Sequence, residues 1–169
     1  MWLTARRPTL VLAPVSAAAA TCRDAGVPVG LGVDGAASNE SASLLEEVRH
    51  SLLFARASGG PKAMTVRDSL EMATAGGARV LGWDSEIGSL EVGKLADIAV
   101  WRLDTLPHID IADPVAALVL GAPPPLELLL VQGKPVVERD RLVNVEEAVV
   151  AREVKSASTN LLSRAGVIS

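Results

Sequence analysis

Residues 27–34, with the sequence VPVGLGVD, constrain the fold more than any other part of the chain. Bulky valine and leucine residues alternate there with proline and glycine, which is the two-residue period of a β-strand, and the alternation ends at Asp34. The alanine-rich segment 16–25 ahead of it predicts a helix that Gly26 ends. A helix, a tight turn and a short strand are typical of a parallel α/β unit. We therefore predict an α/β fold in which Asp34 is the last residue of a strand.

Two helices are predicted after this strand. Ser43 and Glu46 have the spacing of a capping box, and apolar residues then repeat on one helix face at Leu45, Val48, Leu52 and Ala55. A second helix is expected to begin at Thr65, and the glycine pair at 76–77 is expected to interrupt it.

The pattern changes after Gly82 and becomes rich in strands. A strand is predicted over residues 97–103, and a hairpin over residues 126–143 with its turn at 133–134. A closing helix is predicted over residues 145–164.

Composition and charge exclude several classes of function. The 169 residues carry a formal net charge of −4 and only 2% aromatic residues, so neither a basic nucleic-acid surface nor an aromatic stacking platform is predicted. Charges or prolines interrupt every apolar stretch, so no membrane span is predicted. Cys22 is the only cysteine, which excludes an intrachain disulfide and suits a reducing cytoplasm.

The first twenty residues fit two interpretations. Arg6 and Arg7, followed by a short apolar run and small residues, loosely imitate a secretory signal. Pro14 breaks the apolar run, and the alternative is an alanine-rich helix that leads into the domain. The second interpretation agrees with a cytoplasmic location.

Five stretches resemble the C-terminal part of the amidohydrolase superfamily, in the branch that deaminates aromatic heterocycles. They are GVPVGLGVDGAASNES, EVRHSLLFAR, AMTVRDSLEMATAGGARVLG, IGSLEVGKLADIAVW and DPVAALVLGAPP, and together they span most of residues 23–143. The segment GSLEVGKLADIAVW marks the superfamily, and GVDGAASN points to the deaminase branch. Within that branch the chain is most similar to the 8-oxoguanine, guanine, cytosine and triazine deaminases and hydrolases.

This resemblance implies a fold in three regions. Residues 1–82 would hold the last strand, at 27–34, and the following helices of a metal-dependent hydrolase TIM barrel. Residues 83–143 would form part of a small composite β-sandwich, and residues 144–169 would form a C-terminal helix. In the superfamily both ends of the chain build that sandwich, and only the C-terminal contribution is expected here.

The resemblance also implies a catalytic and metal-binding role for Asp34. In such enzymes the aspartate that ends the last barrel strand binds or faces the zinc, takes a proton from the attacking water and passes it to the leaving amine. The expected position agrees, because catalytic groups of this barrel lie at the C-terminal ends of its strands. Asp-Gly is also a common turn pair, so a turn role is the alternative. Ser38 and Asn39 fit either the rim of a substrate pocket, or a helix cap or Asx turn.

The histidines that hold the metal in this superfamily have no counterpart in the sequence. The motifs need a His-x-His pair and further histidines, and the chain has only His50 and His108. His50 follows Glu46 at helical spacing, which predicts a surface pair, and His108 lies in a predicted loop, so neither is expected to be catalytic. A catalytic zinc takes about three protein ligands, and one carboxylate cannot hold it. We therefore expect zinc in the parent family, none held by this chain alone, and no activity of the isolated chain.

Two functional hypotheses follow. The first is a hydrolase of C–N bonds, whose parent activity is zinc-dependent deamination of a small heterocyclic amine. A truncated reading frame, a frameshifted start or a deliberately cut chain would explain the missing barrel. The second is a non-catalytic assembly or interaction domain. A lone parallel strand has no sheet to join. The chain is therefore expected to pair with a second copy of itself, in a homo-oligomer, or with a missing N-terminal barrel segment.

Overall fold

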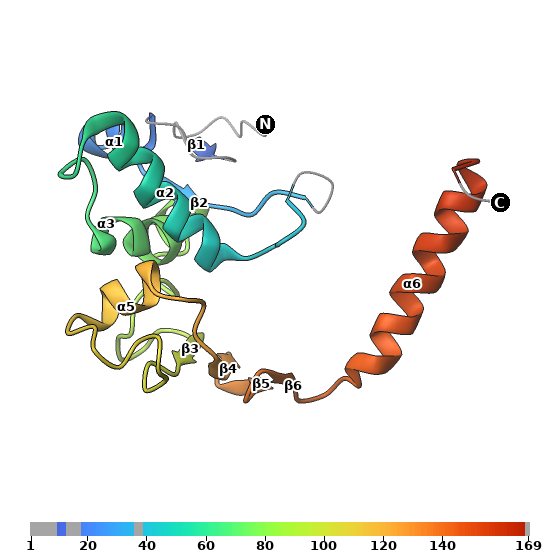
Figure 1. Ribbon diagram of the computed structural model, residues 1–169. Coiled ribbons are helices and arrows are strands. Elements are labelled where there is room, and N and C mark those ends of the chain that lie inside the picture. The colour runs from blue at the N-terminus through green and yellow to red at the C-terminus, as the bar shows by residue number, and fades with distance from the viewer. Residues whose placement is uncertain (1–9, 13–17, 36–38, 168–169) are drawn as a thin grey trace. The chain divides into compact units, whose positions relative to one another are not determined.

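The computed structural model divides into two compact units, each of which is described by itself (Figure 1). Unit 1 comprises residues 1–96 and 103–124, and unit 2 comprises residues 97–102 and 125–169. Within these ranges the structure describes residues 10–12, 18–35 and 39–167. The signal-like start and Ser38 therefore fall outside the described residues. The predicted domain boundaries after residues 82 and 143 stay a prediction.

Unit 1 begins with a parallel strand pair. β1 (Leu10–Leu12) pairs with β2 (Val29–Leu31), and α1 (Ala18–Asp24) lies between them in the chain. The expectation that β2 would have no strand to join is therefore wrong. β2 is also shorter than the predicted strand, because Pro28 has no N–H to donate and β1 offers only three partners.

The helices of unit 1 begin where their capping residues predict. α2 (Leu44–Gly59) begins after Ser43, whose hydroxyl accepts a hydrogen bond of 3.3 Å from the backbone N–H of Glu46. α3 (Val66–Glu71) begins at a complete capping box between Thr65 and Asp68. Both starts are therefore confirmed, and side-chain oxygens satisfy backbone donors that a helix leaves without an internal partner.

The glycine pair at 76–77 does not interrupt the second helix, contrary to expectation. The chain continues through a π-helical turn, η1 (Met72–Gly76), into α4 (Gly77–Leu81). A Cβ on Gly76 would overlap the carbonyl oxygen of Val29, and one on Gly30 would lie 3.0 Å from the Cα of Gly77. The lack of a side chain at Gly30 and Gly76 therefore allows the helical backbone to lie directly against β2.

The core of unit 1 lies between β2 and the helices. Its buried apolar residues are Val29, Val48, Leu52, Ala55, Met64, Met72 and Val119. Two buried hydroxyls, those of Ser51 and Ser69, donate to the carbonyl oxygen of Val48 at 2.8 and 2.7 Å. The few polar groups of this core are thus hydrogen-bonded, as burial demands.

The last helix of unit 1, α5 (Pro114–Leu120), joins this core through Val119. Asp113 caps the helix and also accepts two hydrogen bonds from the Arg67 guanidinium, at 2.7 and 3.1 Å. The bond from Arg67 lowers the pKa of the Asp113 carboxyl below its ordinary value of 3.8. Asp113 therefore links α5 to α3, which carries Arg67.

Unit 2 contains an antiparallel sheet in the order β3-β4-β5-β6. The strands are β3 (Ile98–Trp101), β4 (Leu126–Val131), β5 (Lys134–Glu138) and β6 (Arg141–Leu142). Gln132 and Gly133 have positive φ angles of 51° and 75°, so the hairpin turn lies one residue earlier than predicted. Such tight turns need positive φ at both central positions, which glycine adopts most readily. A second turn at residues 139–140 adds β6, which the sequence analysis did not predict.

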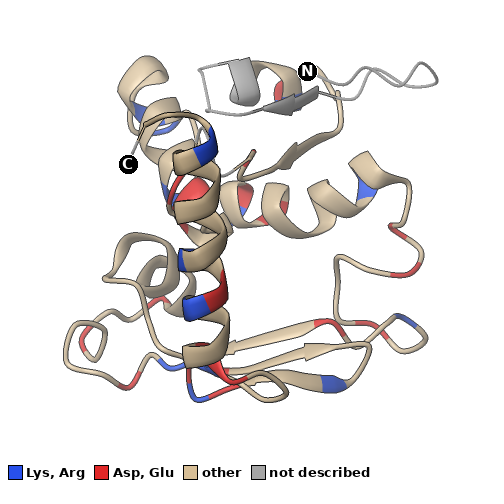
Figure 2. Cartoon of the chain, turned by 90° about the vertical axis from the view of Figure 1, so that its right-hand side faces the viewer, with Lys and Arg blue, Asp and Glu red and all other residues tan. Residues whose placement is uncertain are grey.

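The closing helix of unit 2, α6 (Glu147–Arg164), matches the predicted segment 145–164. In the part of the chain that the structure describes, no helix combines the length and apolarity that a membrane crossing needs. Figure 2 shows that the positions of acidic and basic residues are interspersed along the described part of the ribbon.

Candidate functional site

Asp34 lies three residues beyond the end of β2 instead of on its last position. Its side chain is exposed, and its backbone has a φ of 62°, in the left-handed region. One carboxylate oxygen accepts a hydrogen bond of 2.7 Å from the N–H of Gly35. Left-handed backbone is uncommon outside glycine, and residues held in it are concentrated at functional sites. This backbone conformation thus places an exposed carboxylate in the loop that follows the carboxyl end of β2.

Asn39 organises the loop that follows Asp34. Its amide group donates to Glu47 at 3.0 Å, while its side-chain oxygen accepts from the N–H and the hydroxyl of Ser41, at 3.2 and 3.0 Å. Its backbone N–H also donates to the carbonyl oxygen of Gly35 at 3.1 Å. Of the alternatives for Asn39, the Asx turn is confirmed, and the cap of α2 is formed by Ser43. A place on the rim of a substrate pocket stays a prediction for Asn39 and for Ser38.

Glu47 is the residue of this site that the sequence analysis missed. It lies in the first turn of α2, is 7% exposed and receives the amide bond of Asn39. The signal was present, because Glu47 lies one turn before Ser51 and next to Val48, on the buried side of the helix. A buried carboxylate needs a polar partner, and this pair therefore ties the loop after Asp34 to the first turn of α2.

The two histidines take structural positions. The side chain of His50 is half-exposed, as predicted, but its Nδ1 lies 3.7 Å from Glu47 and not beside Glu46. His108 is 3% exposed, with Thr105 Oγ1 at 2.7 Å from Nδ1 and the carbonyl oxygen of Ala122 at 2.8 Å from Nε2. Because a carbonyl oxygen can only accept, Nε2 carries a proton, and in the neutral ring Nδ1 then accepts from the threonine hydroxyl. His108 thus holds the loop before α5 in place.

Asp34 is the predicted metal ligand of this site. Among the residues that the structure describes, no three histidine, cysteine, aspartate or glutamate side chains are grouped so that they could hold a metal ion. A zinc ion in a catalytic site takes about three protein ligands. The described residues therefore do not fit a complete zinc site, and Asp34 could supply only its one carboxylate to such a site.

Comparison with known proteins identifies the family. Residues 3–136 match the amidohydrolase family, which is more than half of the chain, and the chain belongs to this family. It is 42% identical over 141 residues to a 5-methylthioadenosine/S-adenosylhomocysteine deaminase of Desulforudis audaxviator, covering 82% of this chain and 33% of the relative. It is 36% identical over 139 residues to the 8-oxoguanine deaminase of Pseudomonas aeruginosa, covering 82% of this chain and 31% of that enzyme.

A solved structure extends the likeness to three dimensions. An adenosine deaminase from Xanthomonas campestris with bound zinc superposes with a TM-score of 0.83 at 27% identity, over 90% of this chain and 37% of that one. The predicted resemblance to heterocycle deaminases of the amidohydrolase family is thus confirmed, as is the mixed α/β fold. The chain spans about a third of the length of the curated relatives that it matches.

Proposed function

We propose that this chain forms the C-terminal part of a metal-dependent hydrolase barrel, with part of a composite β-sandwich, and that the whole assembly deaminates a small heterocyclic amine. The observation that supports this most is the geometry of Asp34, an exposed carboxylate in left-handed backbone after the carboxyl end of β2. Catalytic groups of barrel enzymes lie at that end of the strands. The names of the relatives support the substrate class, since they act on aminated purine compounds.

In this proposal Asp34 handles the proton of the reaction. Hydrolytic deamination adds water to the ring carbon that bears the amino group, and the amine leaves as ammonia. The Asp34 carboxylate accepts a proton from the attacking water and gives it to the departing amine. The bond from Gly35 N–H to one carboxylate oxygen orients the group, and the Asn39–Glu47 pair holds the loop that carries it.

The remaining parts of the site come from outside the described residues. The zinc bound in the adenosine deaminase structure supports zinc as the cofactor of the assembled enzyme, with Asp34 as one donor. Because the described residues offer no complete set of ligands, we expect the chain by itself to be inactive. A preceding barrel segment would supply the other donors.

A complementation experiment tests this proposal. The chain is mixed with a form of the Pseudomonas aeruginosa 8-oxoguanine deaminase that lacks the part matched here, and ammonia release from 8-oxoguanine and zinc content are measured. We expect the mixture to gain zinc and activity, and Asp34→Asn to lower the rate by about a thousandfold, a loss typical for a group that acts in the transition state. Asp110→Asn, at an exposed aspartate before α5, is the matched control and should keep the wild-type rate.

Two results would contradict the proposal. One is a mixture that binds zinc and deaminates equally well with Asp34→Asn. The other is a stable complex of the two parts, seen by light scattering, that gains neither zinc nor activity with any of the relatives' purine substrates.

The second candidate function is a non-catalytic assembly domain. It is favoured by unit 2, in which no described residue is buried, so that its apolar side chains are available for another surface. A chain that binds a partner tightly, with no loss of binding or stability on Asp34→Ala, would support this candidate over the enzyme.

A further inference from the structure

α6 is a long helix without a core. It has 18 residues, about 27 Å of helix, and none of them is buried. Eight of these 18 residues are valine, serine, threonine or asparagine, which favour helix less than alanine, leucine or glutamate do. An isolated helix of this kind is marginal in water, because most helix stability in proteins comes from packing an apolar face. A surface that covers α6 is therefore expected.

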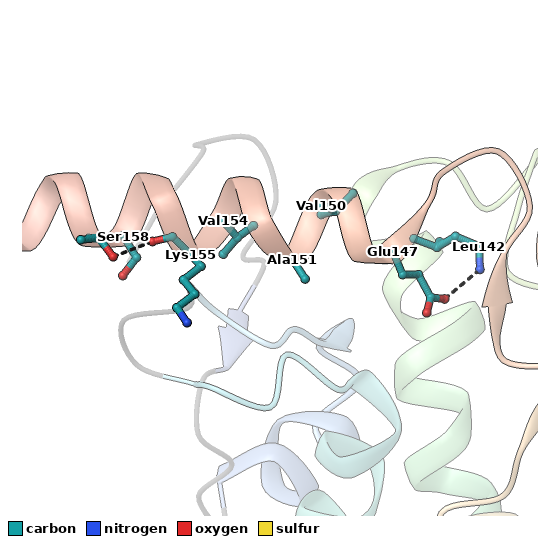
Figure 3. Close-up of a pocket in the computed structure, with 8 residues that line it drawn as sticks. Leu142, Glu147, Val150, Ala151, Val154, Lys155 and Ser158 are labelled. Carbon is teal, nitrogen blue, oxygen red and sulfur yellow. Dashed lines mark hydrogen bonds between the residues drawn. The ribbon is translucent and has the colours of Figure 1, made fainter.

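The apolar residues of α6 lie on one face. Val150, Val154, Ala157 and Leu161 follow one another at spacings of four, three and four residues, so they form a continuous stripe along the helix. Val154 and Leu161 are 62% and 65% exposed. A groove of about 590 Å³ runs beside the stripe, and Figure 3 shows Val150, Ala151 and Val154 along it.

The two ends of α6 carry opposite charges, and Arg152, Glu153 and Lys155 lie between them. Glu146 is the N-cap of the helix, Glu147 is its first residue and Arg164 is its last residue. Two parallel copies would place glutamates beside glutamates and the arginines beside each other. Two antiparallel copies would place Arg164 of each helix beside the glutamates of the other, and would also oppose the two helix dipoles favourably.

We infer that α6 pairs with α6 of a second copy of this chain, in an antiparallel arrangement about a two-fold axis. The stripe is self-complementary in this arrangement, since Val150 meets Leu161 of the other copy and Val154 meets Ala157. A two-fold contact uses the same patch on both chains, which is the commonest form of oligomer. The inference does not depend on the proposed function, because it uses no residue of the Asp34 site.

Sedimentation of the full chain over a range of concentrations tests the apolar contact. We expect a monomer–dimer equilibrium, and we expect Val154→Glu to weaken the dimer at least about tenfold by placing a charge in the apolar contact. Arg152→Glu lies on the opposite side of the helix and is the matched control, expected to change dimerisation little. A wild-type chain that stays monomeric, or a dimer that Val154→Glu leaves intact, would overturn the inference.

Charge reversal tests the partner and the orientation without an apolar substitution. Arg164→Glu should weaken the dimer about threefold to tenfold, since two symmetric ion pairs become repulsive. Glu146→Lys in the same chain should restore it, because the pair is then re-formed with opposite signs. The restored affinity is specific to an antiparallel second copy. Circular dichroism checks that each variant keeps its helix, and failure of the double variant to recover, with helix content unchanged, would sink the antiparallel arrangement.

Discussion

Unit 1 and unit 2 contain similar apolar side chains but use them differently. Unit 1 buries Leu52 completely, together with the neighbouring core residues. Unit 2 has a four-stranded sheet and an 18-residue helix, yet none of its described residues is buried. Hydrogen-bonded secondary structure therefore does not by itself make a core, and unit 2 needs a cover from elsewhere.

The sheet of unit 2 shows why that cover is needed. Cross-strand neighbours share a face, so one face carries Ala99, Leu129, Val137 and Leu142. The other face carries Ile98, Val100, Leu128 and Leu130. An antiparallel sheet with one face in water has polar residues on that face. Apolar residues on both faces indicate a sheet that is packed on both sides.

The largest expected difference in stability between the two units is that between two matched leucine-to-alanine substitutions, one in each unit. We expect Leu52→Ala to lower the free energy of unfolding by about 3 kcal/mol, since it leaves a cavity in the core of unit 1. Leu129→Ala in the half-buried sheet of unit 2 should cost about 1 kcal/mol or less. Urea denaturation followed by circular dichroism measures both. Equal losses would show that unit 2 has a core of its own in solution.

A second prediction concerns the contact of β2 with the helical backbone. Gly76→Ala should destabilise unit 1 by about 2 kcal/mol, because its Cβ would overlap the carbonyl oxygen of Val29. Gly35→Ala serves as the control, since a Cβ there meets nothing within 4 Å. Thermal unfolding of the two variants is compared with the parent chain. If Gly76→Ala melts like the control, the close approach of β2 and η1 is not needed for stability.

The hydrogen bond from Asn39 to Glu47 should contribute less to stability than the core of unit 1 does. Asn39→Ala removes the amide that bonds the buried Glu47, and we expect a loss of about 1–2 kcal/mol with faster proteolysis of residues 34–43. Ser41→Ala, at an exposed hydroxyl of the same loop, should change both measurements less. An unchanged cleavage rate in Asn39→Ala would show that the loop is held by other contacts.

The smallest expected effect is the acid response of the Arg67–Asp113 pair. The bond from Arg67 lowers the pKa of Asp113, so the pair stabilises unit 1 above the ordinary pKa of 3.8 and loses this effect as the pH falls further. In Asp113→Asn, which keeps a capping side chain, the urea midpoint should fall less between neutral pH and about pH 3. An equal fall of the urea midpoint in the parent chain and in Asp113→Asn would show that the Arg67–Asp113 pair adds no measurable stability.

Much of the local structure could be predicted from the sequence. The starts of α2 and α3 were readable from Ser43 and Thr65, because a capping bond joins residues three apart in the chain. The hairpin of β4 and β5 was readable from Gly133 in the same way. The family was readable from whole segments such as GVDGAASN, whose likeness to deaminases the comparisons confirm.

What the sequence determined by itself is thus local: helix starts, turns, the alternation of β2, and the presence of an aspartate beyond it. Only the tertiary structure decided that Glu47 is buried on Asn39, that His108 is enclosed by Thr105 and Ala122, and that the helix continues through Gly76. These outcomes depend on which surfaces meet, because burial and close backbone approach join residues that lie far apart in the chain. The two units differ in burial for the same reason. An apolar pattern shows that a face must be covered, but only the assembled structure decides which surface covers it.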